Sequence, residues 1–283
     1  MTSPYGQRLT ALTEQRGALC VGVDPHPGIL RRWGLSVDAR GLETCARGVV
    51  EALGETVAVF KPQSAFFEAY GSAGIAVLER VLADIAAAGA ISLLDVKRGD
   101  IGSTMDAYAA AYLTDGSPLA ADAITVSPYL GFGSLRGAID LAGSQGRGVY
   151  VLALTSNPEG PEFQHAVTAA GTSVGQAVVD AAAAINATSV EAGQTLGHVG
   201  IVVGATVGRT GVDFGALHGS ILAPGLGAQG GGAAELAEVF GDALPLVLPS
   251  TSREVLSAGP DAEALRGAAR QGLGQMEAAA ALR

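Results

Sequence analysis

The chain has 283 residues, of which 48% are hydrophobic and 16% charged, and this composition excludes a disordered protein or one stabilised mainly by disulfides. Its 27 acidic and 17 basic residues give a formal charge of -10, which argues against binding to nucleic acid or to an anionic membrane surface. An anionic ligand therefore requires a local group of basic side chains or backbone N–H groups.

Eight short apolar runs recur along the chain, and Ala-rich segments of helical character follow most of them. Continuous apolar runs that alternate with helices predict parallel strands buried on both faces, and eight such units close a (β/α)8 barrel. We therefore predict one domain over residues 1–283, with an open doubly wound sheet as the alternative. The first run lacks the G-x-G-x-x-G turn that a dinucleotide-binding sheet would carry. The predicted strands are 18–23, 57–61, 90–97, 123–127, 148–154, 199–206, 220–224 and 245–249.

Several helices are predicted between and after these strands. Apolar residues at helical spacing predict a helix over 75–88. Ser103 is predicted to cap a helix over 104–113, because an acidic residue follows it three positions later. The segment 155–197 is longer than one crossover needs, so we expect an extra helix there. The Ala-rich segment 261–283 is predicted to be a surface helix that closes the barrel.

The chain shows no targeting signal. Its first twenty residues are polar and charged throughout, unlike a secretory signal, and its long uncharged stretches are interrupted by polar residues and glycines. Cys20 and Cys45 lie in apolar sequence without the spacing of a metal site or a redox pair. We therefore expect a reduced, cytoplasmic protein that binds neither nucleic acid nor membrane.

Charged residues gather at the carboxyl ends of the first three predicted strands. Asp24 follows the first strand, Lys61 ends the second, and Asp95, Lys97 and Asp100 lie at or just after the end of the third. Active sites of such barrels lie at this end, and residues two apart on a strand share a face. Buried charges are paired whatever their purpose, so a structural ion-pair network is one interpretation. The chain has few charged residues, so five of them at one end of the predicted barrel favour a chemical role over a structural one.

A lysine beside carboxylates stays protonated and can donate a proton to a developing carbanion. The alternative is a Schiff-base aldolase that uses Lys61 or Lys97, although the nearby carboxylates would keep both amines charged and poorly nucleophilic. By alternation Arg98 points away from the barrel mouth, toward a surface or dimer contact. The four histidines have no metal-ligand spacing, so no metal site is predicted.

A second group of residues follows the last two predicted strands. A glycine-rich segment spans 225–232, and Ser252 and Arg253 follow the eighth strand. Loops at these two places commonly bind phosphate in (β/α)8 barrels. Glycines let the backbone approach a ligand, and an arginine at a helix start can bind phosphate with two N–H groups. The glycine segment alone could be an ordinary flexible loop, but together with Arg253 it favours a phosphate monoester.

Five short segments carry a more specific signal. They read FKPQSAFFE at 60–68, DVKRGDI at 95–101, SP at 127–128, PGLGAQ at 224–229 and SR at 252–253. In these segments the chain resembles orotidine 5'-phosphate decarboxylases of the bacterial type 2 branch, and the resemblance spans essentially its whole length. The resemblance implies a homodimeric (β/α)8 barrel that converts orotidine 5'-monophosphate to UMP and CO2 in pyrimidine biosynthesis, without a metal or an organic cofactor.

The same resemblance implies a role for each matching residue. Asp95 would face the substrate carboxylate, and Lys97 would stabilise and then protonate the carbanion at C6. Lys61 and Asp100 would complete the charge array. Further contacts would come from Asp24 to the ribose, from Ser127 to the pyrimidine edge, and from Gln229 and Arg253 to the phosphate, with Gln229 also reaching the base. Pro128 and Ser252 would bind the substrate as well. Asp100, Ile101 and Thr104 would reach the active site of the partner subunit.

Two other functions remain open at this point. A metal-dependent sugar-phosphate decarboxylase shares the short D-x-K-x-x-D pattern and would lose activity in a chelator. A catalytically silent barrel would bind the nucleotide without releasing CO2, although every charged position of the pattern is present.

Overall fold

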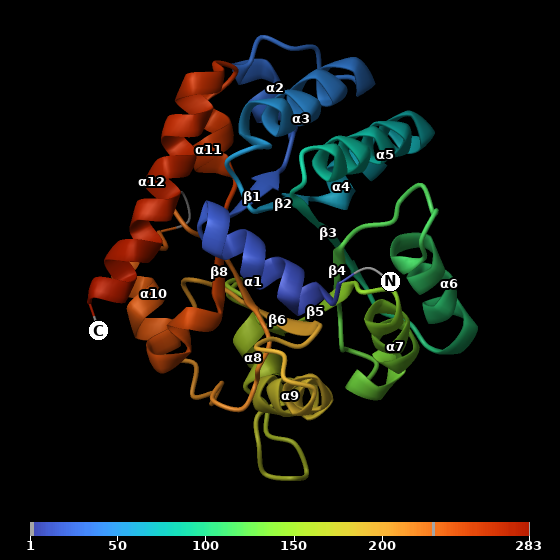
Figure 1. Ribbon diagram of the computed structural model, residues 1–283, viewed down its shortest axis with the longest axis vertical. Helices are drawn as coiled ribbons and strands as arrows, with labels where there is room; N and C mark the ends of the chain where they lie inside the picture. Colours follow the sequence, from blue (N-terminus) through green and yellow to red (C-terminus); the bar gives the residue numbers. More distant parts are fainter. Residues whose placement is uncertain (1–2, 228–229, 283) are drawn as a thin grey trace.

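The computed structural model describes residues 3–227 and 230–282. Within them, parallel strands pair in chain order and close into a barrel of eight (Figure 1). The strands are β1 (Cys20–Val23), β2 (Val59–Pro62), β3 (Ile91–Arg98), β4 (Ala123–Val126), β5 (Gly148–Leu154), β6 (Val199–Val203), β7 (Ile221–Pro224) and β8 (Val247–Thr251). Each overlaps its predicted run, so the predicted (β/α)8 barrel is confirmed. The eighth begins two residues later than expected, because Pro245 belongs to a 3-10 helix.

Helices surround the strands (Figure 1). They are α1 (Tyr5–Arg16), α2 (Pro27–Arg32), α3 (Ala39–Leu53), α4 (Ser64–Glu68), α5 (Gly71–Ala87), α6 (Gly102–Leu113), α7 (Arg136–Ser144), α8 (Gly160–Gln164), α9 (Val174–Glu191), α10 (Ala233–Phe240), α11 (Arg253–Ala258) and α12 (Ala262–Ala281), with 3-10 helices η1 (Phe132–Leu135) and η2 (Gly241–Leu246). The predicted extra helix between β5 and β6 is confirmed by α8. The predicted surface helix near the end is α12, which packs against α3, α10 and α11.

The predicted start of α6 is wrong. The helix begins at Gly102 with Ile101 as its N-cap residue, so Ser103 lies within the first turn and caps nothing. The side chain of Asp100 accepts a hydrogen bond of 2.8 Å from the N–H of Ile101. Gly102 has a φ of 53°, which turns the chain into the helix earlier than the capping pattern predicts.

The barrel interior is filled with apolar side chains at its amino end. Ile91 and Leu93 point inward, as alternation along β3 predicts, and pack with residues of the other strands. α1 lies across this end (Figure 1) and adds Tyr5 and Leu9 to the interior cluster. The Tyr5 hydroxyl lies 3.0 Å from that of Tyr150. The amino end of the interior is therefore filled by packed side chains. In the described part of the chain, none of the helices has the length and apolar character that crossing a membrane requires.

Candidate active site

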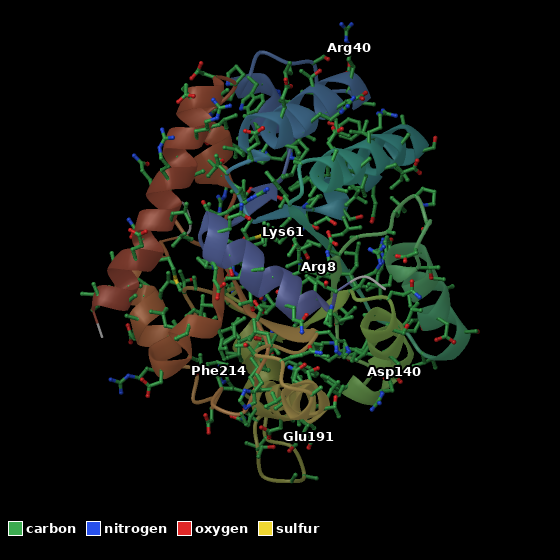
Figure 2. All side chains as sticks on the ribbon, viewed as in Figure 1. Arg8, Arg40, Lys61, Asp140, Glu191 and Phe214 are labelled. Carbon is green, nitrogen blue, oxygen red and sulfur yellow. The ribbon has the colours of Figure 1, made fainter. Side chains whose placement is uncertain are left out.

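A cavity of about 270 Å³ lies at the carboxyl ends of the strands. Residues from the end of nearly every strand line it. They include Asp24, Lys61, Gln63, Asp95, Lys97, Thr125, Leu152, Thr155, Ser156, Val202, Leu222, Ser250, Ser252 and Arg253. Leu152, Val202 and Leu222 also contact the interior cluster, so the cavity has an apolar floor below a polar rim. Figure 2 shows Lys61 near the middle of the barrel.

Asp95 is the centre of the polar rim. Its Oδ1 accepts hydrogen bonds from Lys97 Nζ at 2.7 Å and from the Thr125 hydroxyl at 2.7 Å. Its Oδ2 accepts from Lys61 Nζ at 3.0 Å and from Gln63 Nε2 at 2.9 Å. Asp95 and Lys61 are buried, whereas the Lys97 side chain is 47% exposed. One carboxylate therefore holds two ammonium groups in fixed positions, and only that of Lys97 belongs to a half-exposed side chain.

Burial and charge act in opposite directions on the pKa values of this cluster. Burial raises the pKa of Asp95, but Lys61 and Lys97, with hydrogen bonds from Lys97 and Thr125, hold it below its ordinary value. Burial lowers the pKa of Lys61, but the charges of Asp95 and Asp24 raise it by more. Asp95 and Lys61 are therefore ionised at neutral pH. A protonated Lys61 is a poor nucleophile, which argues against Schiff-base chemistry at that residue.

The end of β3 departs from regular strand geometry. Lys97 has a φ of 44°, in the left-handed region. The pairing of β3 with β4 shifts between Leu94 and Arg98. The N–H of Lys97 donates to the side-chain hydroxyl of Thr125 at 2.9 Å. The side chains of Asp95 and Lys97 nevertheless meet at the barrel mouth, as the sequence predicts.

Arg98 is not among the residues that line this cavity, but it lines an adjoining pocket at the barrel mouth together with Asp95 and Lys97. The prediction that it points away from the mouth is therefore borne out only in part. Arg98 donates to Glu68 of α4 at 2.6 Å, and its guanidinium lies 5.5 Å from the ring centre of Tyr108 on α6. Its observed contacts are within the chain and join the end of β3 to two helices.

Asp24, Ser252 and Arg253 line the same cavity from just after the ends of β1 and β8. Asp24 Oδ1 and the Ser252 hydroxyl are buried and have no hydrogen-bond partner among the described residues. Arg253 begins α11 directly after β8 and lines the cavity together with Gly225. Gly22 of β1 leaves room for this group, because a Cβ there would lie 2.6 Å from the Cβ of Ser252. Buried polar atoms without partners at a cavity wall are suited to binding polar groups of a ligand.

The structure does not bring every predicted residue to the cavity. Ser127 and Pro128 follow β4 and are not among the described residues that line it. The N–H of Ser127 donates to the carbonyl of Arg98 at 2.7 Å. Asp100, which lies just before α6, is also outside the cavity wall. Gln229 lies outside the described residues.

Ile101 and Thr104 lie at the start of α6, away from the cavity of their own chain. Ile101 is 62% exposed and Thr104 is also exposed. Their positions leave them available to a neighbouring molecule.

Five polar residues of the cavity wall, Ser250 among them, have no role in the sequence prediction. Thr155 and Ser156 directly follow β5, where the rule that placed Asp24 after β1 would also have found them. Gln63 lies within the matched segment 60–68, but its bond to Asp95 depends on how β2 and β3 pair. Thr125 shares the inward face of β4 with Ala123, and a polar residue on that face is a signal that sequence reasoning could have used. In the part of the chain that is described, no three His, Cys, Asp or Glu side chains are grouped to hold a metal ion.

A (β/α)8 barrel with an aspartate between two lysines at the carboxyl ends of its strands defines a barrel enzyme with a charged active centre. The chain belongs to the orotidine 5'-phosphate decarboxylase / HUMPS family, whose model matches residues 17–268. The predicted family is thus confirmed, and with it the prediction of a carboxy-lyase, since the close relatives below carry that name.

Individual proteins are similar to this chain over nearly its whole length. It is 59% identical over 275 residues to the orotidine 5'-phosphate decarboxylase of Salinispora tropica, covering 97% of this chain and 98% of that protein. It is 55% identical over 266 residues to that of Streptomyces coelicolor, covering 94% of each. A crystal structure from Streptomyces avermitilis, assigned to the same enzyme, has a TM-score of 0.94 and 54% identity, covering 99% of this chain and 97% of that one.

Proposed function

We propose that this protein converts orotidine 5'-monophosphate to UMP and CO2, the last step in the synthesis of UMP. The observation that carries the proposal is the position of Asp95 between Lys61 and Lys97 at the mouth of the cavity. The names of the close relatives supply the substrate. The arrangement supplies a cation where negative charge develops and an anion that disfavours a second carboxylate beside it.

The reaction breaks the bond between C6 and its carboxylate. CO2 leaves, the bonding electron pair stays on C6, and a proton must then be added there. In the proposed mechanism the ammonium group of Lys97 stabilises the carbanion and transfers a proton to C6. The amine of Lys97 regains a proton from solvent, because its side chain is half-exposed. Lys61 is buried and keeps Asp95 charged through the cycle.

Repulsion between Asp95 and the substrate carboxylate is not enough to carry the rate. Two like charges about 4 Å apart repel by about 4 kcal/mol at an effective dielectric constant of about 20. Enzymes typically lower a barrier by about 8–23 kcal/mol. Most of the effect must therefore come from stabilisation of the developing charge by Lys97 and from binding of distant parts of the substrate.

The part of the cavity wall formed by Asp24, Ser252 and Arg253 is suited to the nucleotide's ribose and phosphate. Arg253 and the backbone near Gly225 are proposed to bind the phosphate, together with Ser252 and Gln229. The unpartnered oxygen of Asp24 is suited to accept a hydrogen bond from a ribose hydroxyl.

The edge of the pyrimidine requires polar groups at the cavity wall. Thr155 and Ser156 line the cavity and are better placed for this contact than Ser127, which the sequence predicts.

A homodimer is part of the proposal. Asp100, Ile101 and Thr104 lie outside the cavity of their own chain, which supports a role in the site of a second subunit. Tyr129 and Leu130 are also exposed, at 71% and 49%, and both follow β4 on the same rim of the barrel. Apolar side chains grouped at a rim are typical of a protein interface. The proposed dimer acts in the cytoplasm and binds a nucleotide, not nucleic acid or membrane.

The test is incubation of the purified protein with orotidine 5'-monophosphate in the presence of a chelator. We expect release of CO2, loss of the orotate absorbance and formation of UMP. Activity that the chelator abolishes would indicate a metal-dependent sugar-phosphate decarboxylase instead. Binding of the nucleotide without release of CO2 would indicate a silent barrel, and covalent trapping of substrate by borohydride would indicate a Schiff base.

A further inference from the structure

Thr125 joins the two residues of β3 that define the active centre. It is 1% exposed, and its hydroxyl oxygen lies 2.7 Å from Asp95 Oδ1 and 2.9 Å from the backbone nitrogen of Lys97. A hydroxyl has one proton to donate and two lone pairs to accept with. The carboxylate can only accept and the backbone N–H can only donate, so the proton of Thr125 goes to Asp95. A single oxygen atom therefore contacts both the anion and the backbone of the proposed proton donor.

The backbone of β3 is irregular where this contact is made. Leu94 pairs with Ile124 and Arg98 pairs with Val126, so a longer interval of β3 faces a shorter interval of β4. Lys97 lies within that interval with a φ of 44°, a conformation that costs a residue other than glycine roughly 1–3 kcal/mol. The hydroxyl of Thr125 supplies the acceptor for the N–H of Lys97 in this irregular stretch.

Resting on the proposed function, we propose that Thr125 is a positioning residue for the decarboxylation. Its hydroxyl holds the Asp95 carboxylate and the left-handed backbone of Lys97 in one arrangement, so that the ammonium group of Lys97 points to the atom that receives the proton. Thr125 itself need not touch the reacting atoms. This role is distinct from that of Lys61 and Gln63, which hold the other oxygen of Asp95 and do not contact Lys97.

The hydroxyl can be removed with little change in volume. Valine has the shape of threonine, so Thr125→Val keeps the side-chain packing and deletes both hydrogen bonds. Without the hydroxyl, the backbone N–H of Lys97 is left unpaired and Asp95 Oδ1 loses one of its two donors, so both residues are less firmly positioned. Displacement of a reacting group by about 1 Å can lower a rate by about 100-fold. The expected effect falls on the chemical step and not on binding, because phosphate and ribose contact other residues.

The experiment compares Thr125→Val and Thr125→Ser with the wild-type protein, using orotidine 5'-monophosphate as substrate. For Thr125→Val we expect kcat to fall about 10-fold to 100-fold, with KM and the Kd for UMP changed by less than about threefold. Thr125→Ser keeps the hydroxyl and is expected to retain kcat within about threefold of the wild type.

Thr251→Val is the matched control. Thr251 is also a buried strand threonine, but its hydroxyl has no hydrogen-bond partner among the described residues, and its methyl group faces α12. This variant should keep the wild-type kcat. The thermal unfolding midpoint of each variant shows whether a loss of kcat comes from unfolding or from displacement of Asp95 and Lys97 in a folded protein.

The outcomes are distinguishable. No release of CO2 by the wild type contradicts the proposed function and this inference with it. If the wild type is active and the kcat of Thr125→Val is within threefold of the wild-type kcat, only the role of Thr125 is contradicted. The same holds if Thr125→Ser is impaired as much as Thr125→Val. If Thr125→Val does not fold, Thr125→Cys, which keeps the size and weakens both hydrogen bonds, is judged by the same limits.

Discussion

The two ends of the barrel both contain buried or part-buried polar groups, but the groups differ in what they contact. At the amino end Arg8 of α1 donates to Asp122 at 2.6 Å and to the carbonyl of Gly146 at 2.9 Å. The second oxygen of Asp122 accepts from the N–H and the hydroxyl of Ser92. At the carboxyl end Asp95 is equally well hydrogen-bonded, but its partners line an open cavity.

The comparison shows that pairing alone does not identify an active site. The charges at the amino end connect α1 to the segments around β3, β4 and β5 by direct hydrogen bonds. At the carboxyl end two lysines share one carboxylate, and the exposed one faces the cavity. Removing a charge at the amino end should therefore affect stability, and removing one at the carboxyl end should affect turnover.

The largest effect is expected for Lys97→Ala, which removes the proposed proton donor. General acid catalysis typically contributes about 10²–10⁴-fold, and loss of charge stabilisation adds to this, so kcat should fall by about 10³-fold or more. The Kd for UMP, measured by titration, should change by less than about tenfold. A near-normal kcat for Lys97→Ala would show that the charges at the carboxyl end, like those at the amino end, have no role in turnover.

The next effect is expected for Arg253→Ala. Loss of a charged, two-pronged contact to phosphate should raise KM by about 100-fold, equivalent to about 2.7 kcal/mol. Steady-state kinetics with orotidine 5'-monophosphate measures it. An unchanged KM would show that the phosphate binds elsewhere.

Arg8→Ala tests the amino end. The change leaves one oxygen of Asp122 without its charged partner, so we expect a loss of about 1–3 kcal/mol in the free energy of unfolding, with kcat and KM within about twofold of wild type. Denaturant unfolding measures the first and kinetics the second. Arg136→Ala, which breaks an exposed ion pair with Asp140, is the control and should change stability by less than about 1 kcal/mol. A fall in kcat for Arg8→Ala without loss of stability would contradict the separation of the two ends.

The smallest effect concerns acid stability. The pKa of Asp95 lies lower in the folded protein than in the unfolded chain, so its charge stabilises the fold above about pH 4, the unfolded pKa. This contribution is lost as the pH falls below that value toward the folded pKa. The difference in unfolding free energy between wild type and Asp95→Asn should thus shrink between about pH 5 and pH 2 and be constant above. Asp140→Asn serves as the exposed control, and a constant difference for Asp95→Asn would show that its charge does not stabilise the fold.

The sequence predicts the strands well because each one is buried on both faces and forms a continuous apolar run. It also predicts that Asp95 and Lys97 meet, since a two-residue period follows from strand geometry alone. The hydrogen bonds of Thr125 could not be predicted in this way. They depend on the shift in pairing between β3 and β4, which is a property of two segments and not of either one.

The start of α6 shows that a local sequence signal can also mislead. A capping pattern at Ser103 is a local signal, but Asp100 and Gly102 begin the helix earlier. Ser127 lies at the predicted rim of the barrel but is not among the residues that line the cavity. Strand ends differ in how far they extend, and the hydroxyls after β5 reach the cavity while the one after β4 does not.

The hydrogen-bond acceptor positions of Asp95 are all occupied, and this has a consequence for inhibitor design. A carboxylate offers about four lone-pair directions, and Lys61, Gln63, Lys97 and Thr125 occupy them. A synthetic compound therefore gains little by directing an N–H or O–H group at Asp95, however central it is. The vacant acceptor is the buried oxygen of Asp24, and a compound that donates to it while placing an anionic group near Lys97 makes better use of the pocket.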